Sequence, residues 1–171
     1  MACNEALRGQ TRSEMTGYQA KFEPAMRAAL AEASAAGDDV PVGAVVLDGS
    51  GAIIGRGRNQ REATADPSAH AEIVAIRAAS ARVGSWRLAD CTLVATLEPC
   101  TMCAGALLVA RMRRLVFGAE DPRAGAAGSV WDVLHDPRLG PPVEVLGGIL
   151  ADECAAVLTE FFERRRQGGT Q

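Results

Sequence analysis

A run of apolar residues leads directly into a pair of cysteines near the middle of the chain. Residues 91–98, CTLVATLE, are rich in aliphatic and β-branched side chains and have the length of a strand. Pro99 ends the run, and the following stretch CTMCAGALLVARM has the composition of an apolar helix. Cys100 and Cys103 lie three residues apart at the start of this helix, so both side chains are expected on one of its faces. A strand followed at once by a helix is typical of an α/β fold.

A second helix start carries one of the two histidines in the chain. In the stretch DPSAHAEIVAIRAA, Asp66 or Ser68 is expected to cap a helix that Pro67 helps to start. Its apolar residues recur at helical spacing. His70 should therefore lie in the first turn of this helix, with Glu72 two residues later.

The other segments predict two more helices and four more strands. Apolar residues recur every three or four positions from Tyr18, and Gly37 closes this helix. PVGAVVLD and AIIGRGR predict a hairpin joined by DGSG, and RLVFGA and VEVLGG predict two strands separated by the loop EDPRAGAAGS. A last amphipathic helix covers residues 150–165. The order α-β-β-α-β-α-β-β-α predicts a three-layer α-β-α sandwich whose central five-stranded mixed sheet is parallel in its later part.

Length and composition predict one compact domain. With 171 residues, the chain can bury one core, and we assign residues 18–167 to this domain, residues 1–17 to an N-terminal arm and residues 168–171 to a C-terminal tail. No apolar run approaches the roughly 18 residues of a membrane span, and no signal peptide is visible, so we expect a cytoplasmic protein without membrane contact. The odd count of five cysteines argues against a disulfide framework and leaves thiols for a metal.

The cysteine pair and the histidine have the residue types of a catalytic zinc site. A helix N-terminus stabilises the thiolate that binds metal. Zinc with three protein ligands keeps a fourth position for water, whereas structural zinc is closed by four ligands. Because zinc lowers the pKa of bound water to about 7, a neighbouring base is needed to move its proton. We therefore expect one zinc ion per chain, held by His70, Cys100 and Cys103, with Glu72 as the proton carrier.

Other interpretations of these residues have to be weighed. A CxxC pair alone can also be a redox pair or half of a structural zinc site. A redox pair needs no distant histidine or glutamate, and a closed zinc site would need Cys91, Cys154 or His135, none of which has a recognisable spacing. His70 alone would be read as a core histidine, and Glu72 alone as part of a solvated helix face. Their combination with PCTMC favours the catalytic site.

The sequence H-A-E, followed after 26 residues by P-C-T-M-C, matches the H-x-E…P-C-x-x-C signature of zinc deaminases. Together with DVPVGAVV, RGRN, VFGAEDPRAGAAGSVWDVL and GILADECAAVLTEFFERRR, it makes the chain resemble the bacterial tRNA-specific adenosine deaminases of the cytidine-deaminase-like superfamily, from about Tyr18 to Arg166. The resemblance implies hydrolysis of the wobble adenosine of a tRNA anticodon to inosine. The base is flipped into the pocket, and Glu72 relays protons to the ring and the departing amine.

The resemblance also implies substrate contacts and a homodimer. Asn59, in RGRN, matches a family asparagine that hydrogen-bonds the base, and Asp121, in GAEDPR, matches an aspartate beside the RNA backbone. The residues alone favour a simpler interpretation of Asn59, as the end of a strand, and Asp121 can equally form a turn before Pro122. In the family, a homodimer packs the segment matching CAGALLVARM between its subunits. The expected partners are therefore a tRNA anticodon stem-loop and a second copy of the chain, with no DNA.

The net charge of −3 is unusual for an RNA-binding protein. Arginines are nevertheless dense in ARMRR, at Arg123 and in ERRRQ, which permits a local basic face. The arginines of ERRRQ are also expected simply because cations are favoured at a helix C-terminus. Two rival functions stay open: a deaminase of a free base or nucleoside such as guanine or cytosine, and a non-catalytic zinc-binding module that recognises RNA.

Overall fold

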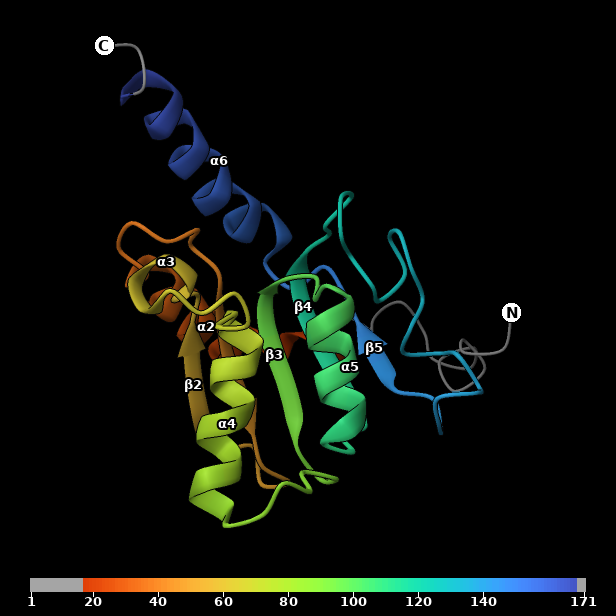
Figure 1. The fold of residues 1–171 in the computed structure, drawn as a ribbon. Coiled ribbons are helices and arrows are strands. Elements are labelled where there is room, and N and C mark those ends of the chain that lie inside the picture. The colour runs from red at the N-terminus through yellow and green to blue at the C-terminus, as the bar shows by residue number, and fades with distance from the viewer. Residues whose placement is uncertain (1–16, 169–171) are drawn as a thin grey trace.

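The computed structural model describes residues 17–168, which form a mixed sheet between two layers of helices (Figure 1). The strand order is β2-β1-β3-β4-β5. The strands are β1 Gly43–Leu47, β2 Ile53–Arg58, β3 Thr92–Leu97, β4 Arg114–Ala119 and β5 Glu144–Leu146. β1 is antiparallel to β2 and β3, whereas β3, β4 and β5 run parallel. This confirms the predicted three-layer sandwich with a five-stranded mixed sheet that is parallel in its later part.

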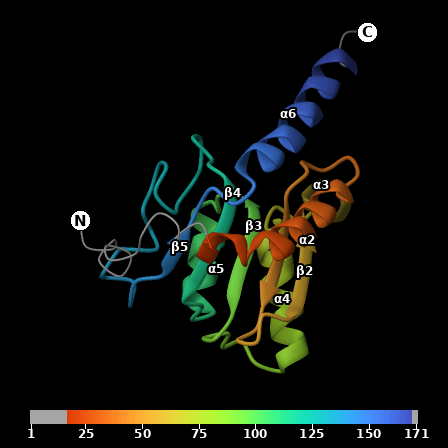
Figure 2. The same cartoon turned by 180° about the vertical axis from the view of Figure 1, so that it is seen from behind.

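Helices cover both faces of the sheet (Figures 1 and 2). α4 (Ala71–Val83) and α5 (Thr101–Val109) lie on one face, and α2 (Glu23–Ser34) and the start of α6 (Ala151–Gly168) lie on the other. Alternate strand residues divide between the two cores, as the period of a strand requires. Toward α4 and α5 point Ala44, Val46, Leu93, Ala95, Leu115 and Phe117; toward α2 and α6 point Val45, Leu47, Val94 and Val116.

Two glycines of β2 let α4 pack backbone to backbone against the sheet. A Cβ atom at Gly57 would overlap the carbonyl oxygen of Ala71, and one at Gly55 would overlap that of Ala75. Only glycine allows this approach without displacing the helix. The glycines therefore fix the distance between β2 and α4.

The starts of two helices differ from the prediction. α4 begins at Ala71 with His70 as its N-cap residue, so His70 precedes the first turn. Asp66 does not cap this helix, because its carboxylate instead accepts hydrogen bonds from the backbone N–H (2.8 Å) and hydroxyl (2.7 Å) of Ser68. α2 begins at Glu23, after a turn that separates it from the helical residues 17–20.

A four-residue helix, α3 (Arg61–Thr64), was not predicted. It lies between β2 and α4 in the chain and ends at Ala65 in the left-handed conformation. No helix within residues 17–168 is both long and apolar enough to span a membrane. The predicted N-terminal arm, apart from Gly17, and the predicted tail, apart from Gly168, lie outside the described residues, as does Cys3.

Candidate active site

Three candidate metal ligands meet where α4 and α5 begin. His70 is the N-cap residue of α4, Cys100 is the N-cap residue of α5, and Cys103 lies in the first turn of α5. The Nδ1 atom of His70 is 3.7 Å from the Sγ atom of Cys100 and 3.6 Å from that of Cys103. Within residues 17–168, these form the one cluster of histidine, cysteine or carboxylate ligands suited to a single metal ion, with all ligand atoms within 4.8 Å of one another.

The chemistry of this donor set fits zinc. Two sulfur atoms and one imidazole nitrogen are ligands that zinc favours, and three protein ligands leave a position for water. Cys91 and Cys154 are buried in the two cores, outside the metal-ligand cluster. His135 pairs with Asp132 at 2.7 Å and is likewise outside the cluster. Among the described residues, the cluster therefore has the open form of a catalytic site.

The two thiols of the cluster form a hydrogen-bonded pair. The hydrogen bond from Cys103, together with His70, lowers the pKa of Cys100 to about 3 although burial opposes this. The pKa of Cys103 is raised because its thiol donates to Cys100 and is buried. Cys100 is therefore the thiol of the pair that ionises more readily. Binding of a cation would displace the proton of Cys103 and complete the ligand set.

Glu72 lies in the first turn of α4 beside the ligand cluster. Only 4% of its surface is exposed, and burial raises the pKa of its carboxyl group. The neighbouring His70 and a hydrogen bond with Cys103 act in the opposite direction. A buried carboxyl group with a raised pKa, next to a site for an activated water, is suited to accept and return a proton near neutral pH.

Asn59 and Asp121, the two predicted substrate contacts, both have partners within the protein. Asn59 follows β2 and is 7% exposed; its Nδ2 atom donates to the Val40 carbonyl at 3.2 Å, and its Oδ1 atom accepts from the Arg61 N–H at 3.4 Å. The Oδ1 atom of Asp121 accepts from the backbone N–H of Arg123 at 2.9 Å, which makes the turn that was the alternative interpretation. Contact of either residue with substrate stays a prediction.

Glu98 is a residue of the site region that sequence reasoning missed. It is 2% exposed and accepts hydrogen bonds from the backbone N–H groups of Asp121, Ala127 and Ser129 and from the Ser129 hydroxyl. Burial acts to raise the pKa of Glu98, but these hydrogen bonds outweigh it and the pKa is lowered. A charged residue that ends an apolar strand directly before Pro99 was the available signal. Glu98 holds the loop after β4 against the cysteine segment.

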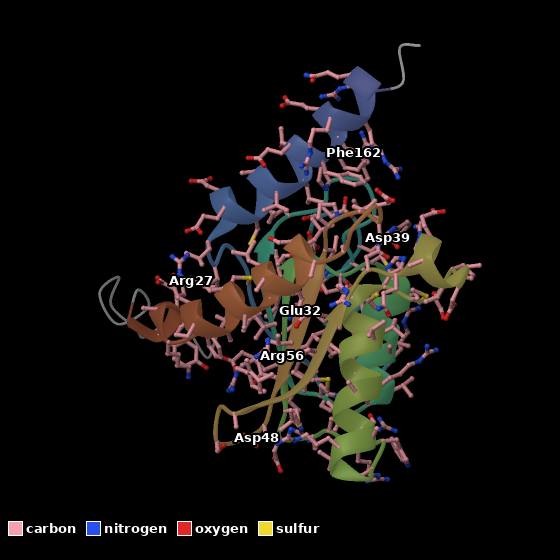
Figure 3. The ribbon with its side chains drawn as sticks, turned by 90° about the vertical axis from the view of Figure 1, so that its left-hand side faces the viewer. Arg27, Glu32, Asp39, Asp48, Arg56 and Phe162 are labelled. Carbon is pink, nitrogen blue, oxygen red and sulfur yellow. The ribbon has the colours of Figure 1, made fainter. Side chains whose placement is uncertain are left out.

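A groove of about 720 Å³ lies between this loop and the last turns of α6. Its walls include Val40, Asp121, Arg123, Phe162 and Arg165. The Phe162 side chain is large, apolar and 45% exposed. Figure 3 shows it on α6, at the same end of the molecule as the segment that leads into β1.

Residues 19–119 match the family model described as the cytidine and deoxycytidylate deaminase zinc-binding region. The chain belongs to this deaminase family. The deaminase is 46% identical over 138 residues to the tRNA-specific adenosine deaminase of Haemophilus influenzae, and the match covers 81% of this chain and 80% of the relative. It is 50% identical to the tRNA(Ile)-lysidine synthase of Deinococcus deserti over 81% of this chain, although it spans only 26% of that longer protein.

A solved structure from a study of A-to-I editing by tRNA:A34 deaminases is also similar, with a TM-score of 0.75 and 43% identity over 78% of this chain and 98% of that one. These findings confirm the predicted zinc-dependent hydrolytic deaminase and its resemblance to the tRNA-specific enzymes. A redox pair, a closed structural zinc site and a non-catalytic module do not agree with the family. The structural cluster and the family together support zinc as the cofactor.

Proposed function

We propose that this deaminase converts the wobble adenosine of a tRNA anticodon to inosine. The observation that carries the proposal is the meeting of His70, Cys100 and Cys103 beside the buried Glu72, in a chain 46% identical to a tRNA-specific adenosine deaminase. The ligand cluster and the glutamate support the hydrolytic chemistry. The similarity to this relative supports the wobble adenosine of a tRNA as the substrate.

Each protein group has a defined task in the reaction. His70, Cys100 and Cys103 would hold a zinc ion, which would supply Lewis-acid activation of a water molecule near C6 of adenine. Glu72 takes one proton from that water and passes it to the ring, and then takes the second, from the hydroxyl group added at C6, and delivers it to the departing amine. Adenosine and water thus give inosine and ammonia. The burial of Glu72 keeps its proton from exchanging freely with bulk water.

The groove beside α6 supports RNA as the substrate class rather than a free base. Arg123 and Arg165 can contact phosphates, and the exposed Phe162 ring can stack on an unpaired base. Asn59 is proposed to hydrogen-bond the flipped base, and Asp121 to accept from a ribose 2′-OH. Three arginines and two acidic residues line the groove, so it is locally positive in a chain whose net charge is −3, which supports the proposed binding of RNA.

The outer face of α5 supports a homodimer. The helix TMCAGALLV has no charged residue; Cys103, Ala104 and Leu107 are buried, yet Met102 is 37% and Val109 70% exposed. A helix that is apolar all round is normally covered on all sides. We propose that a second copy of the chain covers this face. Because the proposed substrate is tRNA, we also place the enzyme in the cytoplasm.

The decisive test uses Glu72→Gln and an adenosine-containing anticodon stem-loop. Because glutamine keeps the shape but cannot carry the proton, zinc and RNA binding should survive while turnover falls at least about 10²-fold. Binding should weaken with added salt, since arginines displace cations from phosphates. If the parent enzyme contains zinc, forms no inosine, does not bind the stem-loop and deaminates guanine or cytosine instead, the tRNA proposal is wrong.

A matched pair of arginine variants tests the groove. Arg123→Gln removes a charge from the groove wall, and Arg82→Gln removes one from an exposed position in the last turn of α4. In Arg123→Gln the slope of log affinity against log salt should fall by about 1. Arg82→Gln should bind the stem-loop like the parent. Equal slopes in both variants would contradict a role for the groove.

A further inference from the structure

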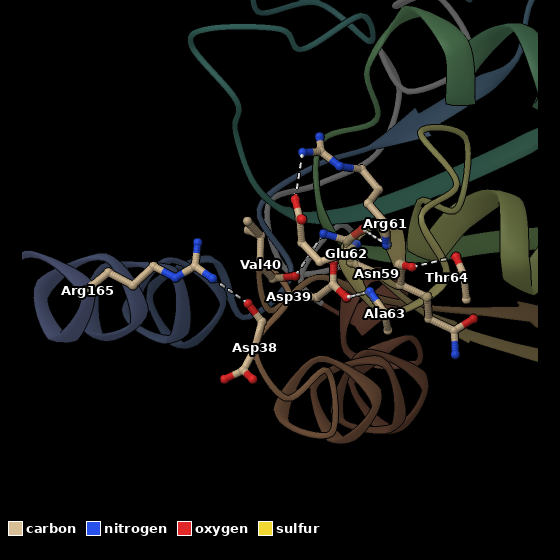
Figure 4. Close-up of polar contacts among 10 residues, drawn as sticks. Asp38, Asp39, Val40, Asn59, Arg61, Glu62, Ala63, Thr64 and Arg165 are labelled. Atoms are coloured by element: carbon tan, nitrogen blue, oxygen red, sulfur yellow. Dashed lines mark hydrogen bonds and ion pairs between the residues drawn. The ribbon is translucent and has the colours of Figure 1, made fainter. Parts of the chain in front are cut away.

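Asp39 is a buried acidic residue that the proposed reaction does not use. It lies in the connection between α2 and β1 and is 3% exposed. Its Oδ1 atom accepts from the backbone N–H of Glu62 at 2.9 Å, and its Oδ2 atom accepts from that of Ala63 at 3.1 Å (Figure 4). Both donors belong to α3, more than twenty positions later in the chain. Asp39 thus caps α3 from a segment that is distant in the sequence, whereas a helix is usually capped by the side chain of its own N-cap residue.

The cap from Asp39 replaces one that α3 lacks. Gln60, at the N-cap position of α3, makes no side-chain capping hydrogen bond. The first N–H groups of a helix have no partner within it, so they need acceptors from elsewhere. Asp39 satisfies two of them, and Oδ1 of Asn59 accepts from a third, that of Arg61. A four-residue helix without these acceptors would have little stability of its own.

One of these hydrogen bonds, that from the Arg61 N–H, also helps to orient Asn59. Its carboxamide is held between Val40, the residue after Asp39, and Arg61, the first residue of α3. A shift of α3 away from Asp39 would therefore move one of the two groups that fix the Asn59 side chain. The Gln60 N–H also donates to the Ala69 carbonyl at 2.9 Å, next to the candidate ligand His70.

The C-terminal helix is attached to the same segment. The guanidinium group of Arg165 in α6 donates to the Asp38 carbonyl at 2.8 Å (Figure 4). Arg165 and Val40 both line the groove proposed for RNA. The residues around Asp39 thus join the groove, α3 and Asn59 by direct hydrogen bonds.

We propose that Asp39 is a positioning residue that sets the orientation of Asn59 toward the substrate base by capping α3. This rests on the proposed function, in which Asn59 contacts the base. Asp39 itself touches no substrate. Its loss should act through Asn59, so the effects of changing the two residues should not be independent.

A double-mutant cycle of Asp39→Ala and Asn59→Ala tests the proposal, with inosine formation on the stem-loop as the assay. Each single variant should lose about 10-fold to 10²-fold in kcat/KM, the scale of a misplaced binding group. The loss should appear mainly as a higher KM, as expected for a contact made in both the enzyme–substrate complex and the transition state. The double variant should lose no more than the worse single variant, and all should retain zinc.

Two further variants separate positioning from general stability. Asp39→Asn keeps one acceptor oxygen and should recover part of the KM defect. Asp48→Ala removes a carboxylate that likewise accepts two backbone N–H groups, but in the hairpin turn at the other end of the molecule (Figure 3). Its KM should equal that of the parent. If Asp39→Ala does not fold, the cycle is run with Asp39→Asn in its place.

Losses that multiply in the double variant, or a KM for Asp39→Ala equal to that of Asp48→Ala, would overturn the proposal. Assays of the parent enzyme distinguish failure of the Asp39 proposal from failure of the proposed function. A parent that deaminates the stem-loop upholds the function whatever the cycle shows. If it deaminates only a free base, the proposed function is wrong, and the same cycle measured on that base decides the role of Asp39.

Discussion

Buried carboxyl groups lie in the candidate site and in the segments that surround it. Asp39, Glu72 and Glu98 are each at most 4% exposed. Burying a carboxylate is costly unless hydrogen bonds or charges compensate it. Asp39 and Glu98 meet this cost with backbone N–H groups of α3 and of the loop after β4. Both of these segments carry a proposed substrate contact or lie next to one.

Loss of one thiol should remove the metal. In Cys103→Ala, two ligands would remain, and two are too few to hold zinc tightly. We expect metal analysis of the purified protein to find zinc well below one per chain. Cys91→Ala provides the control, because Cys91 is buried in a core outside the cluster, and this variant should keep its zinc. Full zinc in Cys103→Ala would contradict the assigned ligands.

Glu98→Ala should destabilise the fold without touching the cluster directly. Three backbone N–H groups and one hydroxyl would lose their buried acceptor, which we expect to cost about 3 kcal/mol of unfolding free energy. Urea denaturation measures this loss. Glu160→Ala, on the exposed side of α6, should change the same quantity by less than about 0.5 kcal/mol. An unchanged midpoint in Glu98→Ala would show that the loop finds other acceptors.

The cluster of candidate metal ligands could be predicted from the sequence because the spacing of its residues is local. His70 with Glu72, and Cys100 with Cys103, are each set by a few positions at a helix start, and only the meeting of the two helices required the fold. Glu98 could not be assigned, because its partners come from the loop after β4, 23 to 31 positions later. Asp39 was missed for the same reason, since spacing within a segment gives no information about such contacts.

Helices and strands with strong periodicity were predicted correctly, and short or competing signals were not. The hairpin of β1 and β2 has clear apolar runs around a turn, and both strands formed as expected. α3 has only four residues and no buried side chain, so no periodicity revealed it. Before the start of α4, both Asp66 and Ser68 are residue types that often cap helices. They hydrogen-bond to each other instead, and His70 takes the N-cap position.

Gly57→Ala should disturb both α4 and the cluster of candidate metal ligands. The added Cβ would meet the Ala71 carbonyl oxygen and the Ala75 backbone nitrogen, so the helix must move. We expect a loss of about 1–3 kcal/mol in unfolding free energy, typical of overpacking. Zinc content should fall as well, because Ala71 directly follows His70.

Gly49→Ala is the matched control for this change. A Cβ at Gly49 would come no nearer than 3.7 Å to the carbonyl oxygen of Asp90, which is an ordinary contact. Thermal midpoint and zinc content should then match the parent. If Gly57→Ala keeps both as well, β2 and α4 are not held as closely as the backbone contact indicates.

At the scale of the whole molecule, the layer order followed from the alternation of strands and helices, but the groove did not. Val40, Arg123 and Phe162 come from three distant parts of the chain. Their meeting depends on α6 extending beyond the sheet, as Figures 1 and 2 show. Helical periodicity gives the buried side of such a helix but not its direction relative to the sheet.

The proposed dimer predicts a sedimentation mass of about twice 17.9 kDa at micromolar concentration. Val109→Glu should shift the mass toward a single chain, because a charge on the outer face of α5 would be buried without a partner. Val83→Glu places the same charge on an exposed position at the end of α4 and should leave the mass unchanged. A parent mass near that of one chain would count against the dimer.

The place of β1 in the sheet has a consequence during synthesis. β1 pairs with β2, which follows it closely, and with β3, which a ribosome completes only after residues 59–91 have been added. At about 5–20 residues per second, the unpaired edge of β1 stays open for seconds. An open edge can pair with a strand of another chain. Aggregation of the nascent protein should therefore be most sensitive to delays in translating the segment between β2 and β3.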